Sequence, residues 1–392
     1  MQKVAGREWM RAGVAVALAS LVLAIGLSAG VGAHDDDDDD RYDSGSGRRL
    51  FERETFEGNG RTCATCHSRR TGTVSPEDAR ERFAENPDDP LFRADGSDDG
   101  NGHGVSRMLA DATVLVRVSL ADNVSLADDP SARSVVVRRG IPTTLNTPSL
   151  DPVLMLDGRQ PSLEQQVKGA IGDHAQGQRP PTAKELELIA VFERTRQFFS
   201  SRDLFAFAWT GQAPALPKGR TAAEKRGRTF FEDVPFTSPS QKAGICAACH
   251  SGPMLNETNQ FLPVPAVRRG SRFQTVLVSE LNAAGNPLHD FVFKNADGTT
   301  THVVSPDAGR ALITGKSTGF EDPNAFKIPT LWGVSETAPY FHDNSAKTLA
   351  DVVEHYARFF AIVSAQPGGA GPALVLSEQD KADLVAYMKL LR

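Results

Sequence analysis

Apolar residues recur at helical spacing in several stretches of the chain, and polar residues that can cap a helix stand at their starts. Leu186, Ile189 and Phe192 follow one another at steps of three, with Phe199 seven positions further on. Such spacing places them on one face of a helix. Capping boxes, in which Ser or Thr is followed three positions later by an acid, mark three predicted helix starts: Thr182 with Glu185, Thr221 with Glu224, and Ser377 with Asp380.

The stretches between these helices are rich in Gly, Pro, Asp and Ser, which are typical of loops. We predict loops over 72–107 and over 253–325, the second with a hairpin around residues 295–298. Residues 108–137 mix short apolar runs with polar breaks, so strand and helix both stay open there. Residues 205–220 contain several Gly and Pro residues and are predicted to link two domains.

Two short segments nearly repeat each other, and each precedes a pair of cysteines. Gly47-Arg48-Arg49-Leu50-Phe51-Glu52 starts 16 positions before Cys63, and Gly227-Arg228-Thr229-Phe230-Phe231-Glu232 starts 19 positions before Cys246. Internal similarity of this kind indicates two copies of one module. We therefore expect a mostly α-helical fold with two helical domains, over 47–204 and 221–392.

All four cysteines belong to Cys-x-x-Cys-His motifs, Cys63-Ala64-Thr65-Cys66-His67 and Cys246-Ala247-Ala248-Cys249-His250. Both thiols of such a motif can form thioethers with the vinyl groups of a haem, and the histidine then binds the iron from one face. A zinc site needs about four ligands in one cluster, whereas these motifs lie 183 positions apart. A redox dithiol does not require the histidine that follows both pairs. The motifs predict two covalently attached haem c groups.

The N-terminus predicts export. Basic residues precede an apolar stretch from Ala12 to Gly30, and small residues lead up to Ala33, which is typical of a secretory signal over 1–33. A membrane anchor is the alternative, because the stretch approaches spanning length, but its Ala and Gly content favours cleavage. Attachment of haem c usually takes place outside the bacterial cytoplasm, so we expect a periplasmic protein without stable membrane insertion.

Charge and length narrow the picture further. Residues 34–46 contain the acidic run Asp35–Asp40, which predicts a disordered tail. After cleavage of the signal over 1–33, about 359 residues remain, which is enough for two domains. The formal net charge is −6, and no basic stripe with interleaved aromatic residues is present. Nucleic acid is therefore not expected as a partner.

The chain resembles the bacterial dihaem cytochrome c peroxidase family, which includes the MauG proteins. The resemblance rests on both cysteine motifs and on Arg139 to Asn146, Asp157-Gly158-Arg159, Asp307-Ala308-Gly309-Arg310 and Pro329 through His342. It implies two cytochrome-c-like helical domains with one haem each. It also implies that the N-terminal haem, with His67 as fifth ligand, reacts with hydrogen peroxide. The C-terminal haem, with His250, passes electrons.

The resemblance also identifies a sixth ligand for the C-terminal haem. The family carries it on the helix after the Tyr-Phe-His-Asp segment, as Met in most peroxidases and as Tyr in MauG-like members. Here that position is Tyr356, on a helix predicted to follow Thr348. An anionic phenolate stabilises the ferric and higher states of the iron. Met254 and Met388 are competing candidates.

The chain departs from the family at several positions. Leu156 replaces a tryptophan before Asp157, and Gln176 stands where the family has the glutamate that helps to split peroxide. Glutamine can orient peroxide but cannot transfer a proton, so His174 is the alternative acid–base catalyst. The family also binds calcium between its domains. The carbonyl donors match Thr337 and Pro339, whereas the family's asparagine donor is replaced by Gly140.

Three functions follow for testing. The first is a peroxidase-type oxidoreductase that reduces hydrogen peroxide at the N-terminal haem. Its electrons would arrive through the C-terminal haem from a small redox protein, such as a cytochrome c or cupredoxin, or from a protein side chain that is being modified. The second is a dihaem electron carrier or redox sensor. The third is an oxygenase that acts on an organic substrate.

Overall fold

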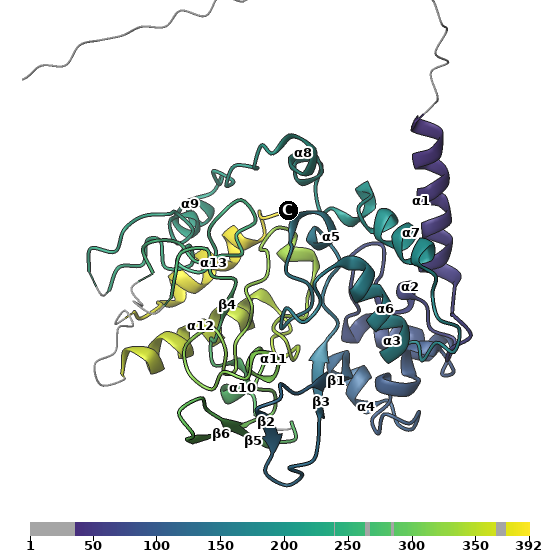
Figure 1. Cartoon of the computed structure of the whole chain (residues 1–392). Coiled ribbons are helices and arrows are strands. Elements are labelled where there is room, and N and C mark those ends of the chain that lie inside the picture. Colours follow the sequence, from purple (N-terminus) through teal and green to yellow (C-terminus); the bar gives the residue numbers. More distant parts are fainter. Residues whose placement is uncertain (1–35, 239, 263–266, 284–285, 366–373) are drawn as a thin grey trace, which may run out of the picture.

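The computed structural model describes residues 36–392, except 239, 263–266, 284–285 and 366–373 (Figure 1). The predicted signal over 1–33 lies outside the described residues. Among the described helices, none is both long enough and apolar enough to cross a bilayer. Helices prevail and are joined by small antiparallel sheets and long irregular segments. The prediction of a helical fold therefore holds in outline, with more strand than expected.

The helices of the N-terminal half pack through aromatic rings. They are α1 (Asp36–Arg53), α6 (Leu163–Asp173) and α7 (Ala183–Glu193). Phe51 of α1 meets both Phe192 and Phe198 edge to face, with ring centroids 5.5 Å apart. The capping box at Thr182 starts α7 as predicted. This packing holds α6 and α7 beside the first cysteine motif.

The structure differs from the expectation of a disordered acidic tail over 34–46. Helix α1 already begins at Asp36 and runs through the acidic residues. Acidic residues near a helix N-terminus are favoured by the positive end of the helix dipole. Leu50 and Phe51 are buried and fix the other end of α1 in the core. The acidic run is therefore continuous with a packed helix.

The predicted loop over 72–107 is also more regular than expected. It contains α3 (Pro76–Glu85), the 3-10 helices η1 (Pro90–Phe92) and η2 (Ala94–Gly96), and the start of α4 (Ser106–Asp111). Ser75 caps α3 and forms a capping box with Asp78. Leu91 is fully buried. The Gly, Asp and Pro residues of this region thus act as helix starts and stops.

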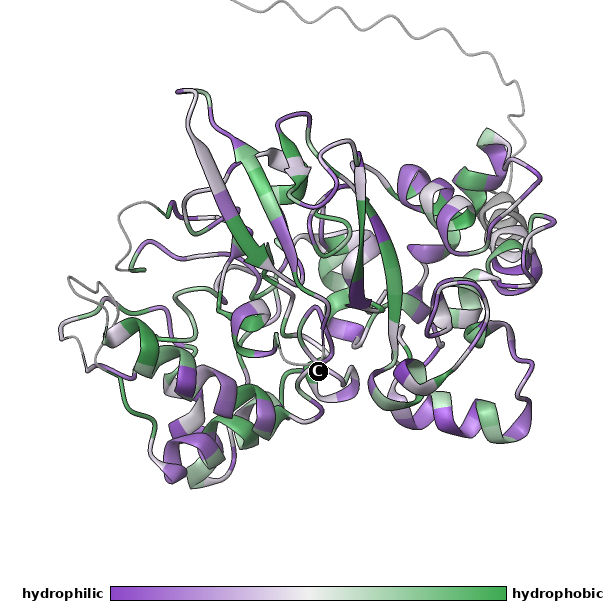
Figure 2. Cartoon of the chain, turned by 90° about the horizontal axis from the view of Figure 1, so that it is seen from below, coloured by the Kyte–Doolittle hydropathy of each residue, from purple (hydrophilic) through white to green (hydrophobic). Residues whose placement is uncertain are grey.

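The ambiguous stretch 108–137 contains strands. β1 (Thr113–Ser119) pairs antiparallel with β3 (Ser134–Gly140), so that Val116 faces Val137 across the ribbon. β2 (Val124–Leu126) pairs with β5 (His289–Lys294), and β5 pairs with β6 (Thr300–Ser305). The β5–β6 turn confirms the hairpin predicted around residues 295–298. Figure 2 shows that these strands carry both hydrophobic and hydrophilic residues.

The β2–β5–β6 sheet joins the two halves of the chain. Its strand β2 comes from the first half, whereas β5 and β6 come from the second. The core beneath it includes Val118 from β1, Phe291 from β5 and Leu312, and all three are fully buried. One hydrophobic core therefore contains residues of both predicted domains.

The C-terminal half is built around three helices. α9 (Ala222–Thr229) packs on α13 (Glu378–Met388), and α12 (Leu349–Ser364) lies next to α13. A Cβ at Gly227 would overlap the backbone oxygen of Asp383, so glycine permits the close approach of α9 and α13. The capping boxes at Thr221 and Ser377 start α9 and α13 as predicted.

The remaining described elements are short. α8 (Arg202–Thr210) occupies the first half of the predicted linker over 205–220. The others are α2 (Cys63–Cys66), α5 (Thr147–Leu150), η3 (Arg196–Phe198), β4 (Phe273–Gln274), α10 (Val278–Leu281), α11 (Ala311–Thr314), β7 (Phe326–Lys327) and η4 (Val334–Glu336).

Candidate haem sites

The first cysteine motif forms the short helix α2, and its histidine points into a cavity. The hydroxyl of Thr65 accepts a hydrogen bond from the backbone of Thr62 at 2.9 Å and closes the start of α2. His67 follows directly, and its Nδ1–H donates to the Gly72 carbonyl at 2.7 Å. This bond fixes the tautomer and leaves Nε2 as a lone-pair donor, the arrangement typical of metal-binding histidines.

The second motif repeats this arrangement. His250 donates from Nδ1 to the Leu255 carbonyl at 2.8 Å. Burial lowers the pKa of both His67 and His250, which keeps the imidazoles neutral and able to bind a metal. The two motifs thus present the same ligand in the same tautomer, although they lie in different halves of the chain.

The thiols fit haem attachment better than a zinc or dithiol centre. The four cysteines are free, and burial raises the pKa of Cys246 and of Cys249 to about 12. Burial raises the pKa of Cys63 and of Cys66 as well. Zinc and redox dithiols need thiolates. Within the described residues, no group of three or more His, Cys, Asp or Glu side chains is placed to hold a metal ion.

A large cavity opens in front of His67. It contains about 1330 Å³ of space without protein atoms, part of it open to solvent. Cys63, Cys66 and His67 line one side. Helix α6 lines another, with Gln166, Val167, Ala170, Ile171 and His174. The residues present therefore fit a haem held by the first motif.

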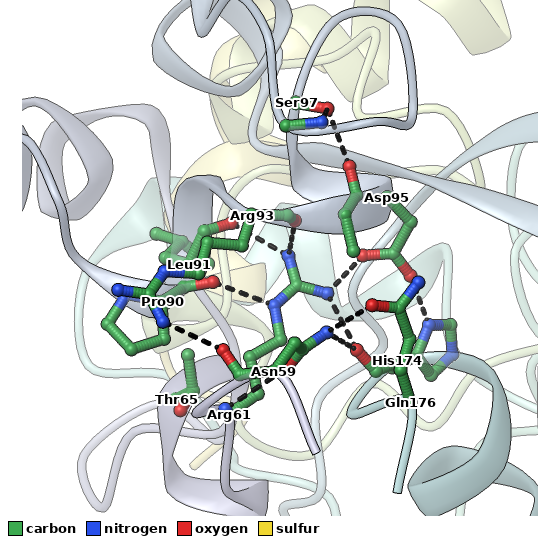
Figure 3. A network of polar contacts seen from close by, with 12 residues as sticks. Asn59, Arg61, Thr65, Pro90, Leu91, Arg93, Asp95, Ser97, His174 and Gln176 are labelled. Carbon is green, nitrogen blue, oxygen red and sulfur yellow. Dashed lines mark hydrogen bonds and ion pairs between the residues drawn. The ribbon is translucent and has the colours of Figure 1, made fainter.

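His174 belongs to a buried network of charged groups (Figure 3). Its Nδ1 lies 2.5 Å from Oδ2 of Asp95, on the 3-10 helix η2. Asp95 also pairs with Arg61, whose side chain is 2% exposed. Burial alone would raise the pKa of Asp95, but the hydrogen bond from His174 and the charge of Arg61 hold it below its usual value. The structure thus brings His174 into the cavity together with a charged pair.

Gln176 does not reach the same space. It is exposed, its φ is +51°, and its Oε1 accepts a hydrogen bond from Asn59 at 3.3 Å. The same Asn59 amide group donates to the His174 carbonyl at 2.9 Å. Gln176 is not among the residues that line the cavity. Of the two predicted catalytic residues, only His174 faces the cavity.

Glu193 adds a carboxyl group to the cavity wall. The residue ends α7 and is 5% exposed, and its Oε2 has no hydrogen-bond partner. Burial raises its pKa to about 8, against the charge of Arg194. A buried carboxyl without a partner stays protonated near neutral pH, because ionisation would place an uncompensated charge in an apolar environment.

The C-terminal motif lies near an aromatic cluster. Tyr356 lies on α12, as predicted, and its ring contacts Phe341 and Phe360 with centroids 6.4 and 6.1 Å away. Burial and the nearby Cys249 and Cys246 raise its pKa. The tyrosine therefore lies close to the second motif, in agreement with its predicted role as sixth ligand.

Other side chains near Tyr356 are engaged elsewhere. His355 is buried, and its Nε2 lies 2.7 Å from the Val276 carbonyl. Met254 and Met388, the competing candidates for the sixth ligand, are buried in the same apolar cluster as Phe360. Of the two neighbours on α12, His355 is engaged with the Val276 carbonyl, and Tyr356 is the one that lies near the cysteines of the motif.

A buried arginine connects the two halves. Arg139 donates to Asp157 at 2.5 Å and to Asp307 at 2.6 and 3.0 Å. All three side chains are at most 2% exposed. Leu156, where the family has tryptophan, lines the N-terminal cavity beside Arg139. These motif residues therefore form one electrostatic junction between the first and second halves.

Asn344 lies beside Gly140. A Cβ at Gly140 would overlap Oδ1 of Asn344. The Asn344 amide group donates to the carbonyls of Asp111 and Ala112 at 2.9 and 3.0 Å, so its hydrogens are engaged there and its oxygen lies toward Gly140. Calcium requires oxygen ligands that point at it. Calcium binding by the carbonyls of Thr337 and Pro339 stays a prediction without a side-chain donor from residue 140.

The sequence did not single out three groups of the N-terminal site. Arg61, Asp95 and Glu193 are separated along the chain and meet only in the fold. Arg61 precedes Cys63 by two positions, and this proximity to the motif was an available signal. Asp95 lies in a region rich in aspartate, and Glu193 ends a helix with many charged residues. Neither position differs in pattern from a solvent-exposed acid.

No family model matches the chain. Among curated proteins it is similar to cytochrome-c peroxidase IdrP1 of Pseudomonas sp. (strain SCT), with 24% identity over 61% of this chain and 64% of that protein. It is 31% identical to cytochrome c551 peroxidase of Nitrosomonas europaea, over 55% and 58%. It is 27% identical to methylamine utilization protein MauG of Methylophilus methylotrophus, over 66% and 70%. The match thus spans about three fifths of the first two relatives.

Solved structures with related folds include a MauG-like protein associated with microbial copper homeostasis. It shares 19% identity over 89% of this chain and 88% of its own, with a TM-score of 0.48. The diheme peroxidase BthA from Burkholderia thailandensis shares 16% identity over 89% and 86%, with a TM-score of 0.46. The assignment rests on the sequence matches and the two motifs rather than on these scores. By its sequence, the chain is similar to bacterial cytochrome c peroxidases and to MauG.

Proposed function

We propose that the protein is an exported, periplasmic oxidoreductase that reduces hydrogen peroxide at its N-terminal site. Electrons are passed through the C-terminal site from a small redox protein, such as a cytochrome c or cupredoxin, or from a protein side chain. The overall reaction takes one H₂O₂, two electrons and two protons to two waters. Two covalently bound haem c groups supply the electron transfer and the iron that binds peroxide oxygen.

The chain's own residues hold these groups. Cys63 and Cys66 provide thioether links at the N-terminal site, and His67 binds from Nε2. Cys246 and Cys249, with His250, do the same at the C-terminal site. The hydrogen bonds from the histidine Nδ1 atoms to Gly72 and Leu255 keep both rings in the required orientation.

The observation that carries the proposal is the different kind of residues near the two motifs. His67 faces a cavity with polar groups, whereas the C-terminal motif faces Tyr356 and an apolar cluster. An open position admits peroxide, and a filled one favours electron transfer. The cavity of His67 is thus the proposed peroxide site.

Within that cavity, His174 is the proposed acid–base catalyst. Its Nδ1 is occupied by Asp95, so Nε2 is the atom that can take a proton from peroxide and return it to the leaving oxygen. Gln176 acts only indirectly in this proposal. It binds Asn59, which in turn binds the backbone of His174 at the end of α6.

At the C-terminal site, Tyr356 is the proposed sixth ligand. Its raised pKa means that the phenol keeps its proton in the apolar cluster until a strong cation displaces it. A phenolate of this kind stabilises the ferric state. The site then passes electrons without opening to solvent.

A second function, electron transfer or redox sensing without peroxidase activity, is favoured by one observation. His174 donates its Nδ1–H to a carboxylate, which is also the arrangement of a histidine that binds a metal. If His174 bound the iron, both haems would be six-coordinate. Leu156 and the exposed Gln176 agree with this alternative.

Electron paramagnetic resonance of the ferric protein, before and after peroxide, tests the proposal. We expect one high-spin and one low-spin haem, with the high-spin signal consumed by peroxide. The Cys63→Ser/Cys66→Ser protein should lack the high-spin signal, and the matched Cys246→Ser/Cys249→Ser protein should retain it. Two low-spin haems that ignore peroxide, in both the ferric and the half-reduced protein, would favour the electron carrier or sensor.

A further inference from the structure

Asp95 and Arg61 surround His174 from two segments that are distant in the sequence. Asp95 lies on η2 and contacts His174 through Oδ2 and Arg61 through Oδ1. Their side chains are 12% and 2% exposed. We infer that Asp95 and Arg61 are positioning residues that hold His174 with its Nε2 free toward the cavity, as the proton acceptor for a weak acid bound there. This inference rests on the proposed function of the N-terminal site.

The tautomer of His174 follows from the chemistry of its partner. An ionised carboxylate only accepts hydrogen bonds, so the Nδ1 of His174 must carry the hydrogen. Asp95 is ionised because Arg61 and His174 hold its pKa below the usual value. The lone pair of the neutral imidazole therefore belongs to Nε2, and His174 lines the same cavity as His67.

Arg61 fixes the position of Asp95 and of the end of α6 at once. Its guanidinium donates to the carbonyls of Pro90 and Leu91 at 2.8 Å and of Arg93 at 2.7 Å. It also reaches the His174 carbonyl at 3.2 Å. Figure 3 shows the guanidinium surrounded by these groups. With its donors engaged, Arg61 has little freedom to move, and it lies two positions before the cysteine of the haem motif.

The segment that carries Asp95 fits only with glycine at position 96. A Cβ there would overlap the Leu91 carbonyl and Nη2 of Arg61. The close contact brings the backbone of η2 against the guanidinium, which places the Asp95 carboxylate beside it. The arrangement is thus supported by backbone packing as well as by side-chain charge.

The charge of the network suits proton uptake. Asp95 and Arg61 neutralise each other, so a proton on His174 adds one positive charge that the nearby carboxylate stabilises. His67 interacts electrostatically with His174. The other titratable or charged side chains that line the same cavity are Glu54, Arg61, Cys63, Cys66, Arg139, Arg159, Glu193 and Lys327. A weak acid HX in the cavity can then give its proton to Nε2 and remain as X⁻. With peroxide, the same proton passes to the leaving oxygen, which departs as water.

Cyanide binding to the ferric protein tests the inference independently of peroxide turnover. Hydrogen cyanide must lose its proton to bind as cyanide, so the association rate reports the base. We expect Asp95→Asn and His174→Gln each to slow binding by roughly 10²-fold near neutral pH, as for loss of a general base. The pH dependence of the association rate should also change in both variants.

A second Asp–His pair, Asp99 with His103, provides the control. Asp99 contacts Nδ1 of His103 at 2.8 Å, but both residues are exposed and neither lines the cavity. Asp99→Asn should leave the rate and the pH profile unchanged. If Asp95→Asn fails to fold because Arg61 loses its partner, His174→Gln alone still tests the base. Asp95→Glu, which keeps the charge, should restore part of the rate.

The outcomes separate the inference from the proposed function. Unchanged cyanide binding in Asp95→Asn would overturn the inference, even if the protein reduces peroxide. Cyanide binding that depends on Asp95, in a protein inert to peroxide, would support the inference and reject the peroxidase. A ferric low-spin haem that becomes high-spin in His174→Gln would identify His174 as an iron ligand and overturn its role as a base.

Discussion

The two cysteine motifs are almost the same in sequence, but the residues opposite them differ in kind. The cavity in front of His67 is lined by His174, Glu193 and Arg61, and Asp95 contacts both His174 and Arg61. Near the second motif lie Tyr356, Phe341, Phe360 and Met254. The first site thus combines a cavity with several titratable groups, whereas the residues near the second motif are mostly apolar and surround the phenol of Tyr356.

This difference shows which part of the chain decides the chemistry. In the proposed function the motif supplies the thioethers and the fifth ligand, and its local histidine hydrogen bonds are equivalent at both sites. The opposite face comes from other elements, α6 and η2 in one half and α12 in the other. One attachment module can therefore serve for substrate chemistry or for electron transfer, depending on what packs against it.

The largest effect on stability is expected from removing Arg139, which connects the two halves of the chain. Arg139→Leu would leave the buried carboxylates of Asp157 and Asp307 without their partner. Breaking a buried ion pair from one side costs about 3–5 kcal/mol. We expect the free energy of unfolding, measured by urea, to fall by about this amount and both haem spectra to change together. Arg159→Gln is the control, since Arg159 is more exposed, at 15%, and its loss leaves the pairing of Asp157 with Arg139 in place. A loss below about 1 kcal/mol in Arg139→Leu would mean that the sites are held together by other contacts.

Glu193 gives the next largest effect, and it depends on pH. Burial in the folded protein raises the pKa of its carboxyl from the ordinary value of 4.5 to about 8. The folded state therefore binds the proton of Glu193 more tightly than the unfolded state does. The stability that this proton contributes is fully present below pH 4.5 and is lost as the pH rises to about 8. Glu193→Gln should remove this loss. We expect the free energy of unfolding of the variant to exceed that of the wild type by up to about 5 kcal/mol at alkaline pH, since each pKa unit corresponds to roughly 1.4 kcal/mol.

The control for Glu193 lies on the same helix. Glu187 is exposed and pairs with Lys184, so Glu187→Gln should leave the pH dependence of unfolding unchanged. Equal stability of Glu193→Gln and wild type from acid to alkaline pH would show that the carboxyl has a partner in the holoprotein.

Local signals in the sequence predicted much of the fold. Helices began where Thr182, Thr221 and Ser377 formed capping boxes, because this start is encoded within four residues. The helical segments in 72–107 were missed because the same Gly, Pro and Asp residues are typical of loops. The pairing of β2 with β5 depends on contacts between distant segments, and no local pattern reports it.

The sequence predicted those residues of the candidate sites that belong to local motifs, and it missed those that meet only through the fold. The motif histidines and Tyr356 were found because each belongs to a recognisable segment. Gln176 was placed by its register in the chain, but a positive φ turns this residue to the surface and leaves His174 facing the cavity. Asp95 and Arg61 meet only through the packing of η2 against the motif. Groups that act together across distant segments therefore required the structure.

A smaller effect is expected at the junction beside Gly140. The Cβ of Gly140→Ala would overlap Oδ1 of Asn344 and disturb the amide contacts to Asp111 and Ala112. Such overpacking costs about 1–3 kcal/mol, measured as a lower free energy of unfolding.

Gly172→Ala is the matched control. Gly172 lies exposed on α6 with open space around it, so its replacement should stabilise the helix by up to about 1 kcal/mol. A neutral Gly140→Ala would show that the Asn344 segment can move away.

Tyr356→Phe should have the smallest effect on stability and the most specific effect on spectroscopy. The ring packs against Phe341 and Phe360, and the variant keeps this packing, so the free energy of unfolding should change by less than about 1 kcal/mol. The oxygen, in contrast, is the proposed ligand that makes the second site electron-transferring. Its removal should alter the low-spin ferric signal of the C-terminal haem and leave the signal of the His67 haem and its reaction with cyanide unchanged.

Phe360→Leu, which changes the packing but keeps the phenol, is the control and should lower stability without removing the ligand. An unaltered low-spin signal in Tyr356→Phe would exclude the tyrosine as ligand. The contrast between the two sites would then rest on the polar N-terminal cavity alone, because the C-terminal site would lose the one group that distinguishes it chemically from a packed core.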